Sequence, residues 1–321
     1  SSPMSATSPI ASHRERDLRA ITADGVFFSV MVGLGETYVP AFALAVGLGE
    51  IVAGLVATVP MLAGAVLQLV TPFAVRRLGS YRRWVVVCAR LQALSFLPLI
   101  VGATLGEVSL LWVGIATVGY WGFGMSTGPA WNAWVTSLVP AETRAGFFAR
   151  RTRAAQAGLL IGLILGGLAL EAGRGREVEL PVFAGLFAGA LLCRLVSSAF
   201  LGAQSERPGL ARSHRTLGPA AAWRRLRRAG SAPVLGYLLA MQGATHIAAP
   251  YFTPYMLGPL ELSYGQFMAL VAASFLSRAA ALPLLGRLAQ ERGTRHLLWL
   301  GGVGIVPLPL LWLVSHAFAY L

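Results

Sequence analysis

Nine apolar runs, each about 20 residues long, follow one another almost without interruption along this chain of 321 residues. A helix of about 20 residues, rising 1.5 Å per residue, spans the ~30 Å hydrocarbon core of a bilayer. Backbone polar groups in that core must be satisfied within the segment, and barrel strands would instead show short alternating patterns. We therefore predict an all-α polytopic membrane protein. The expected spans lie approximately at 21–46, 51–75, 84–105, 109–137, 154–172, 180–202, 234–257, 264–285 and 296–319.

Composition supports the same class. Hydrophobic residues make up 56% of the chain and charged residues 12%, whereas a soluble domain carries roughly 25% charged residues. The net charge is +13, and every basic residue other than histidine is arginine. These arginines cluster between the apolar runs, as expected of loops on the cytoplasmic side of a membrane. We therefore expect the lipid bilayer, and no nucleic acid, as a partner.

The distribution of arginines predicts the orientation. With a cytoplasmic N-terminus, 21 arginines fall in inside segments and only Arg174 and Arg176 fall outside. This bias predicts a multi-pass protein of a bacterial-type cytoplasmic (inner) membrane with its N-terminus in the cytoplasm. Residues 1–20 are polar and form the expected cytoplasmic tail. No cleavable signal peptide is visible.

The sequence offers little for catalysis or cofactor binding. Cys88 and Cys193 lie inside apolar runs, without the spacing of metal ligands. Gly-Leu-Gly-Glu occurs twice, but no Gly-Lys-Ser that would cradle phosphate follows either copy. We expect no cofactor, no metal and no enzyme activity. The missing nucleotide site favours energy drawn from an ion gradient.

A stretch of different composition divides the chain. Residues 204–232 are rich in arginine, glycine and proline, and include the run A-W-R-R-L-R-R at 222–228. We predict a cytoplasmic linker there, with a short amphipathic helix at the membrane surface. Six spans precede the linker, in a bundle over 21–203, and three spans follow it over 233–321.

An internal repeat relates the two parts. The inside loop after the second span reads P-F-A-V-R-R-L-G-S-Y-R-R from Pro72, and the loop after the eighth reads G-R-L-A-Q-E-R-G-T-R from Gly286. Aligning Gly79 with Gly293 also brings the starts of the first and seventh spans close together. Two six-helix halves in parallel repeat are a known transporter architecture.

These loops resemble the signature loop of the major facilitator superfamily, approximately G-x-L-A-D-R-x-G-R-R between helices 2 and 3, with a weaker copy between helices 8 and 9. The match is carried by Arg77, Gly79 and Arg82 in the first copy and by Gly286, Leu288, Ala289, Gly293 and Arg295 in the second. The departures are Pro72 and Arg76 in the first copy, at the glycine and aspartate positions, and Gln290 at the acidic position of the second. In the fifth span, Gly162, Gly166 and Gly167 are similar to the G-P-x-x-G-G antiporter motif, with Leu163 for proline.

The resemblance implies two bundles around a central cavity lined partly by helix 1. If the second half mirrors the first, it should continue to about residue 417. On this expectation three further helices of the C-terminal bundle are missing after residue 321. The alternative is a genuine nine-helix protein.

Ionisable groups within the spans are candidate functional residues, because each costs on the order of 2.5–3.5 kcal/mol at a helix centre. Glu36 lies midway along the first span. It shares a helical face with small or polar residues, namely Gly25, Ser29, Gly33, Thr37 and Pro40. A carboxylate there can take up a proton or pair with a cationic substrate. The alternative is an acid paired to another helix for packing.

Other candidates carry weaker signals. Asp24 is either functional or an interfacial or capping acid. Gln242, His246 and Thr253 share a face of the seventh span, where the histidine is either a pH-sensitive group or a structural hydrogen-bonding one. Arg194 and Arg278 either bind an anionic substrate, neutralise a buried acid or reach the headgroups. Asn132, beside Trp131, is the candidate from the fourth span, although tryptophans there also suit an interfacial belt.

Together these features predict a secondary active transporter that moves a small solute by alternating access. Glu36 would be the coupling or substrate carboxylate, with His246 and Gln242 across the cavity. Protons, or another coupling ion, would drive transport, and the glycine motif favours efflux by an antiporter. We expect a monomer. A non-transporting sensor or scaffold on the same fold, and a membrane-embedded lipid-modifying enzyme, are the alternatives.

Overall fold

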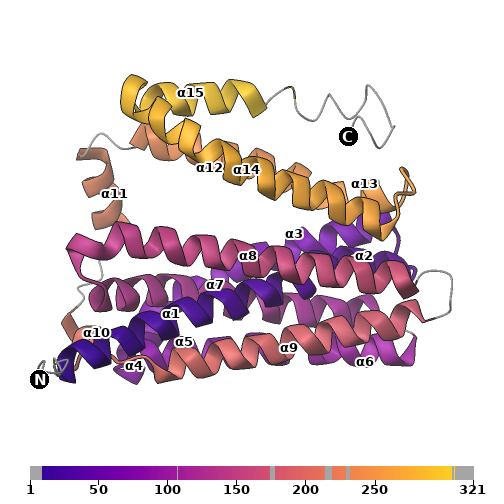
Figure 1. The fold of residues 1–321 in the computed structure, drawn as a ribbon, viewed down its shortest axis with the longest axis horizontal. Coiled ribbons are helices and arrows are strands. Elements are labelled where there is room, and N and C mark those ends of the chain that lie inside the picture. Colours follow the sequence, from indigo (N-terminus) through magenta and orange to yellow (C-terminus); the bar gives the residue numbers. More distant parts are fainter. Residues whose placement is uncertain are drawn as a thin grey trace, which may run out of the picture.

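The structure is a computed structural model that describes residues 9–106, 108–173, 178–213, 219–228, 232–305 and 307. Every regular element in these ranges is a helix (Figure 1). Up to residue 203 the elements are α1 (Pro9–Leu34), η1 (Glu36–Tyr38), α2 (Val39–Ala45), α3 (Glu50–Leu67), η2 (Gln68–Val70), α4 (Thr71–Leu78), α5 (Tyr81–Leu94), α6 (Leu97–Leu105), α7 (Leu110–Leu138), α8 (Ala141–Gly173) and α9 (Glu179–Ala203). They are followed by α10 (Leu210–Ser213), α11 (Pro219–Arg228), α12 (Ala232–Ala248), η3 (Ala249–Tyr251), α13 (Phe252–Leu257), α14 (Tyr264–Arg292) and α15 (Thr294–Ile305).

Within the described ranges, five helical stretches are long and apolar enough to cross a membrane, and each coincides with a predicted span. They are His13–Ala45, Glu50–Leu78, Tyr81–Leu105, Ala141–Gly173 and Glu179–Ala203. Large apolar side chains such as Leu62 and Leu69 are 69% and 75% exposed on the outside of the helices. Such a surface is unfavourable in water and matches a lipid environment.

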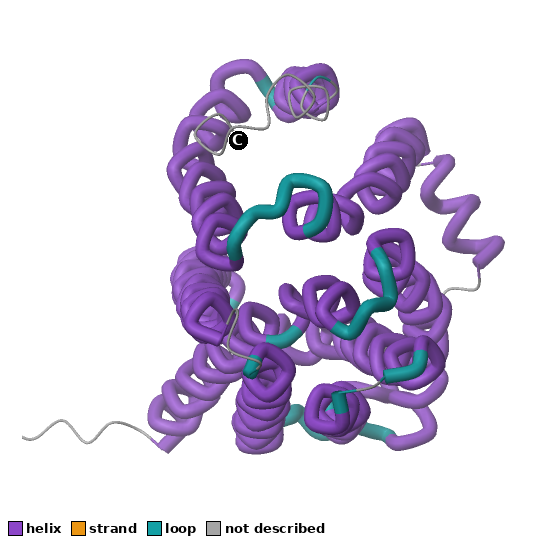
Figure 2. The backbone as a smooth tube through the Cα atoms, turned by 90° about the vertical axis from the view of Figure 1, so that its right-hand side faces the viewer, coloured by secondary structure: helices purple, strands orange, loops and turns teal. Residues whose placement is uncertain are grey.

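The first half forms a bundle in which α1 packs on both α8 and α9, and α7 packs on α3 and α5. Its core is aromatic: Phe42 contacts both Phe183 and Phe187, and Phe96 stacks on Phe187. The second part, α12 to α15, lies along one side of this bundle (Figures 1 and 2). It contacts the bundle through α14 against α8, through η3 against α3, and through α13 against α2 and α3.

The internal repeat of the sequence is also present in the positions of the helices. The second span runs from Glu50 to Leu78, and α14 runs from Tyr264 to Arg292, an offset of 214 residues at both ends. The glycines that follow, Gly79 and Gly293, both have positive φ angles, of 65° and 81°. The first and seventh spans are each interrupted by a three-residue 3-10 segment, η1 and η3.

Several helix ends differ from the predicted boundaries. The first helix begins at Pro9, inside the expected tail, and α8 begins at Ala141, 13 residues before the predicted start at 154. The α8 extension is tied to α1 by Arg151, which donates to the Ile21 carbonyl and pairs with Asp24, and Asp17 of the α1 extension accepts from Ser205. The predicted linker helix is present as α11. The ninth predicted span is described only as far as Ile305; residues 308–319, like Arg174 and Arg176, lie outside the described residues.

Candidate functional site

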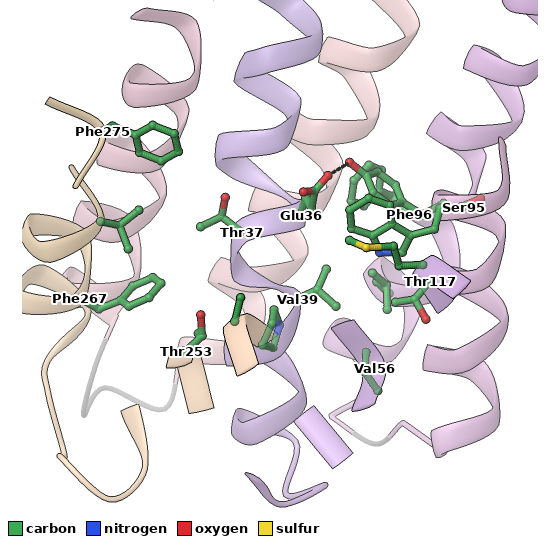
Figure 3. A pocket seen from close by; sticks show the side chains of 17 residues that line it. Glu36, Thr37, Val39, Val56, Ser95, Phe96, Thr117, Thr253, Phe267 and Phe275 are labelled. Atoms are coloured by element: carbon green, nitrogen blue, oxygen red, sulfur yellow. Dashed lines mark hydrogen bonds between the residues drawn. The ribbon is translucent and has the colours of Figure 1, made fainter. Parts of the chain in front are cut away.

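A cavity of about 550 Å³ lies between the N-terminal bundle and the first helices of the second part. The N-terminal bundle contributes side chains from the first four spans, including Glu36, Phe96 and Tyr120. From the other side, η3 and α13 contribute Ala249 and Thr253, and α14 contributes three side chains one turn apart, Phe267, Val271 and Phe275. Figure 3 shows Glu36 between these two walls.

A helix break places Glu36 at this cavity. The first helix ends at Leu34, and Pro40 stands in the first turn of α2. Proline lacks the N–H that would bond four residues back, to the carbonyl of Glu36. The chain between them forms η1, which begins at Glu36. No side chain fits at Gly35, where a Cβ would lie 2.7 Å from the Phe96 ring.

The Glu36 carboxylate has one side-chain partner in the described structure. The phenol of Tyr120, on α7, donates to Glu36 Oε2 at 2.5 Å (Figure 3). Glu36 itself is half-buried and remains open to the cavity. Tyr120 is only 6% exposed, and its ring packs edge-on against Phe96. Glu36 is thus oriented by a rigid donor while part of the carboxylate stays available to a ligand.

A second polar network is fully inside the N-terminal bundle. Asp24 is 3% exposed and lies 3.7 Å from the guanidinium of Arg151. Its other oxygen accepts from Ser197 Oγ at 2.7 Å, and Ser197 in turn accepts from Arg194. Arg194 also donates to Gln92 Oε1 at 2.8 Å. The network joins α1, α5, α8 and α9, and two arginines surround one aspartate.

The basic loop between α4 and α5 is held by the segment that follows α9. Glu206 accepts from the backbone N–H of Tyr81 at 2.6 Å and from the Ser80 hydroxyl at 2.5 Å. Arg82 donates to the Gln204 carbonyl. A carboxylate at a helix N-terminus satisfies free N–H groups and interacts favourably with the helix dipole. Glu206 therefore supplies an acidic group to a loop whose own sequence has Arg76 at the acidic position.

The glycine motif of α8 allows close helix packing. A Cβ at Gly162 would lie 2.5 Å from the Val30 carbonyl of α1, and one at Gly166 would lie 2.4 Å from the Tyr38 ring. A Cβ at Gly167 would lie 2.8 Å from Met268, on α14. The motif thus brings α8 against both the first span and the second half.

The family model of the Major Facilitator Superfamily matches the chain from residue 25 to residue 321. The chain belongs to the Major Facilitator Superfamily. The match confirms the family that the sequence resembles, and membership implies a two-bundle fold. A comparison with curated proteins finds no match.

Members of this superfamily are multi-pass membrane proteins that move small solutes and are typically not enzymes. A cavity between the two halves of a major facilitator is where a solute-binding site is expected, because transporter sites lie at the interface of the repeats. Among the described residues, no three histidine, cysteine, aspartate or glutamate side chains cluster as metal ligands.

The candidates on the first span divide between the two sites. Glu36 and Thr37 line the cavity, whereas Asp24 lies in the buried network. Asp24 is not a helix cap, because α1 begins well before it. The small-residue stripe that shares a face with Glu36 packs against α8 at Gly33, where a Cβ would lie 2.4 Å from the Leu159 carbonyl. The stripe is a packing face there.

The seventh span contributes Thr253 to the cavity, but not Gln242 or His246. Both of these side chains are exposed on α12, where His246 Nδ1 contacts the Gln242 carbonyl at 2.9 Å. His246 precedes Thr253 by seven residues, about 10 Å along a helix. The two side chains therefore do not lie across the cavity from Glu36 in this structure.

Three further candidates also lie away from Glu36 or outside the description. Asn132 is exposed and follows Tyr120 by twelve residues, about 18 Å along α7. Arg194 belongs to the Asp24 network, so of the three readings its geometry fits the neutralisation of a buried acid. The side chain of Arg278, on α14, lies outside the described structure.

The loop-motif residues occupy equivalent turns. Arg77 lies in the last turn of α4, Gly79 caps that helix in a left-handed conformation, and Arg82 lies in the first turn of α5. In the second copy Gly286 is within α14, Gly293 follows that helix, and Arg295 lies in the first turn of α15. These left-handed positions favour glycine, the residue without a Cβ.

Sequence reasoning missed the partners of the acidic residues. Tyr120 was visible only as an aromatic residue one turn from Thr117 in an apolar span. Arg151 was counted as a cytoplasmic loop residue, although it lies within α8 and pairs with Asp24. Glu206 was one charge in a polar linker. None of these pairings has a local sequence signal, because the partners are 84 to 127 residues apart.

Proposed function

We propose that this major facilitator is a proton-coupled secondary transporter that exports a small solute by alternating access, with Glu36 as its coupling carboxylate. The observation that carries the proposal is a membrane-embedded carboxylate that is open to a cavity between the two halves. Such a group is costly in a bilayer unless it is used or neutralised. The described cavity lining contains no arginine or histidine that would neutralise it permanently.

The mechanism follows from the two protonation states of Glu36. As a carboxylate, Glu36 accepts from Tyr120 and can bind a ligand through its remaining lone pairs. As a neutral acid it no longer needs a counter-charge, so the cavity can close around it at lower cost. Alternation between these states couples proton movement to the exposure of the cavity. Tyr120 is the positioning residue that keeps the acid oriented in both.

The 3-10 segments are candidate hinges for movement of the two halves relative to one another. Segments η1 and η3 interrupt the first and seventh spans at the cavity, one in each half. Short 3-10 stretches inside longer helices often mark hinges. The likeness of the α8 glycine motif to the antiporter motif favours exchange of inward protons for outward solute.

We infer that the N-terminus faces the cytoplasm of a cell with an inner membrane. The α4–α5 turn, α10, α11 and the α14–α15 turn gather at the same end of the helices (Figure 1). Arginines are concentrated in these segments. The positive-inside rule then assigns that end to the cytoplasmic side.

The test is solute-driven proton movement in liposomes. Purified protein would be reconstituted with an imposed pH gradient, and lumenal pH recorded while cations, anions and neutral solutes are added. We expect one class of solute to dissipate the gradient, and Glu36→Gln to abolish that flux while still accepting from Tyr120.

Glu15→Gln is the control. Glu15 lies on the same helix, α1, its side chain is 72% exposed and it does not line the cavity, so the flux of this variant should equal that of the wild type. Flux that survives Glu36→Gln would remove Glu36 from coupling. A panel in which no solute moves protons would contradict proton-coupled transport altogether.

A further inference from the structure

The cavity lining has the charge of a cation site. Glu36 is the one charged side chain among the described residues that line it. The buried guanidinium of Arg194, on α9, does not line the cavity and is engaged by Gln92, by Ser197 and by the ring of Phe28 at 4.8 Å. Within the described lining, an anionic solute would therefore meet a carboxylate without a compensating positive charge.

Of the five hydroxyl side chains in the described cavity lining, all but Thr253 donate within the protein. Thr37 donates to the Val32 carbonyl at 3.0 Å, Ser95 to Leu91 at 3.0 Å, and Thr117 to Val113 at 2.7 Å. Tyr120 donates to Glu36 itself. A sugar or other polyhydroxylated solute needs several well-placed partners to offset its desolvation. The described lining has few donors left to provide them.

The remaining walls are apolar and aromatic. Phe96 and Trp121 contribute from the N-terminal bundle, and Phe267 and Phe275 from α14. Figure 3 shows Phe267 and Phe275 on the wall opposite Phe96, with Glu36 between them. Aromatic faces attract cations, and the attraction grows when the cation is desolvated. A volume of about 550 Å³ fits a molecule of several rings.

We propose that the solute of this transporter is a hydrophobic organic cation, whose positive charge pairs with Glu36 while its apolar groups lie among the aromatic side chains. This inference rests on the proposed function and specifies its substrate class. A single carboxylate matches a single positive charge. Burial of the positive charge is tolerated because it is paired with Glu36. The aromatic walls accommodate the bulky apolar groups around that charge.

The test compares two probes of the same size and shape but opposite charge. Radiolabelled tetraphenylphosphonium and tetraphenylborate would be equilibrated with purified protein immobilised in a nonionic detergent. We expect saturable binding of the phosphonium and none of the borate. Glu36→Gln should weaken phosphonium binding by about 10-fold or more, and Phe275→Leu by about 3- to 10-fold.

Two further variants separate binding from folding. Glu36→Asp retains the charge and should recover part of the affinity lost in Glu36→Gln, while Glu15→Gln should bind as the wild type does. Each variant would first be checked for a monodisperse elution profile and an unchanged melting temperature. If Glu36→Gln does not fold, the Phe275→Leu result and the preference between the probes still decide the proposal.

The outcomes distinguish the substrate class from the transport function. Borate binding equal to phosphonium binding, or phosphonium binding unaffected by both Glu36→Gln and Phe275→Leu, would overturn the cation assignment. No phosphonium binding in a protein that moves protons with another solute would overturn the assignment and leave proton-coupled transport standing. Glu36-dependent phosphonium binding without any proton flux would support the cation site and contradict the coupling.

Discussion

At the scale of single residues, two acids of the first span meet opposite environments. Asp24 and Glu36 are twelve residues apart, about 18 Å along a helix. Asp24 is held between two arginines and is 3% exposed, whereas Glu36 has one phenol partner and faces a cavity. A fully paired acid fixes structure, and a partly paired one is free to exchange partners. This difference separates the structural acid from the proposed coupling acid.

The Asp24 network makes a prediction about stability. Asp24→Asn leaves the guanidinium groups of Arg151 and Arg194 buried without their counter-charge. We expect the free energy of unfolding to fall by about 3 kcal/mol, because removing one partner of a buried pair costs on the order of 3–5 kcal/mol. The measurement is denaturant unfolding in detergent micelles. Asp24→Asn combined with Arg151→Gln should cost less than the sum of the two single substitutions.

An exposed pair on the same helix is the control. Glu15 and Arg19 are four residues apart, with side chains 72% and 84% exposed. Exposed pairs contribute little, so Glu15→Gln should not change the unfolding curve. An Asp24→Asn protein as stable as the wild type, or strictly additive substitutions, would contradict the network.

At the scale of helices, glycine spacing decides how closely α1 and α8 approach. A Cβ at Gly33, on α1, would lie 2.4 Å from the Leu159 carbonyl of α8. A Cβ at Gly162, on α8, would lie 2.5 Å from the Val30 carbonyl of α1. Both neighbours are backbone atoms and cannot rotate away. The break that presents Glu36 to the cavity follows directly after this contact. Packing of α8 on α1 therefore also sets where η1 lies.

Gly33→Ala should separate these helices. We expect a loss of about 1–3 kcal/mol in the free energy of unfolding, because an added methyl group in a tightly packed interface forces a backbone shift. Gly185→Ala, on α9, is the matched control. A Cβ at Gly185 would meet no atom within 4 Å, so this change should be neutral or stabilise by up to about 1 kcal/mol. Thermal unfolding of the two variants side by side tests the prediction, and equal effects would contradict it.

At the scale of the whole molecule, the two parts of the chain contact each other through few elements. On one side α8 meets α14, where Gly167 faces Met268. On the other side η3 meets α3, where Tyr251 faces Gly54. The cavity lies between the parts. Alternating access requires these contacts to change during transport.

A disulfide across the α8–α14 contact should stop transport. In Gly167→Cys/Met268→Cys, with Cys88 and Cys193 replaced by serine, the new Cβ atoms start 2.8 Å apart. A disulfide forms at about 3.8 Å, so a small separation of the helices suffices. We expect oxidation to abolish solute-driven proton flux and a reductant to restore it. Trypsin cleavage in the arginine-rich linker should leave the oxidised halves joined on a gel.

Gly185→Cys/Met268→Cys is the control for that experiment. Nothing lies within 4 Å of a Cβ at Gly185, so this pair should not crosslink and should keep its flux under oxidation. A crosslinked Gly167→Cys/Met268→Cys protein that transports at the wild-type rate would show that α8 and α14 move as one unit.

The sequence by itself determined the class of protein and the position of its elements. Long apolar runs, loop arginines, and a repeat anchored at Gly79 and Gly293 are local features, and each predicts helices, loops or symmetry without any partner. Glu36 was also identifiable, because an acid in an apolar run is costly wherever it packs. These signals depend on neighbours within one or two turns of helix.

Only the tertiary structure decided what the polar side chains do. Tyr120, Arg151 and Glu206 acquire their roles from partners in distant parts of the chain. Gln242 and His246 do not line the cavity, because they lie on α12, about two or more helical turns before Thr253. A face of a helix can be predicted from periodicity. Which helix covers that face, and at what height, is set by packing between segments that are far apart in sequence.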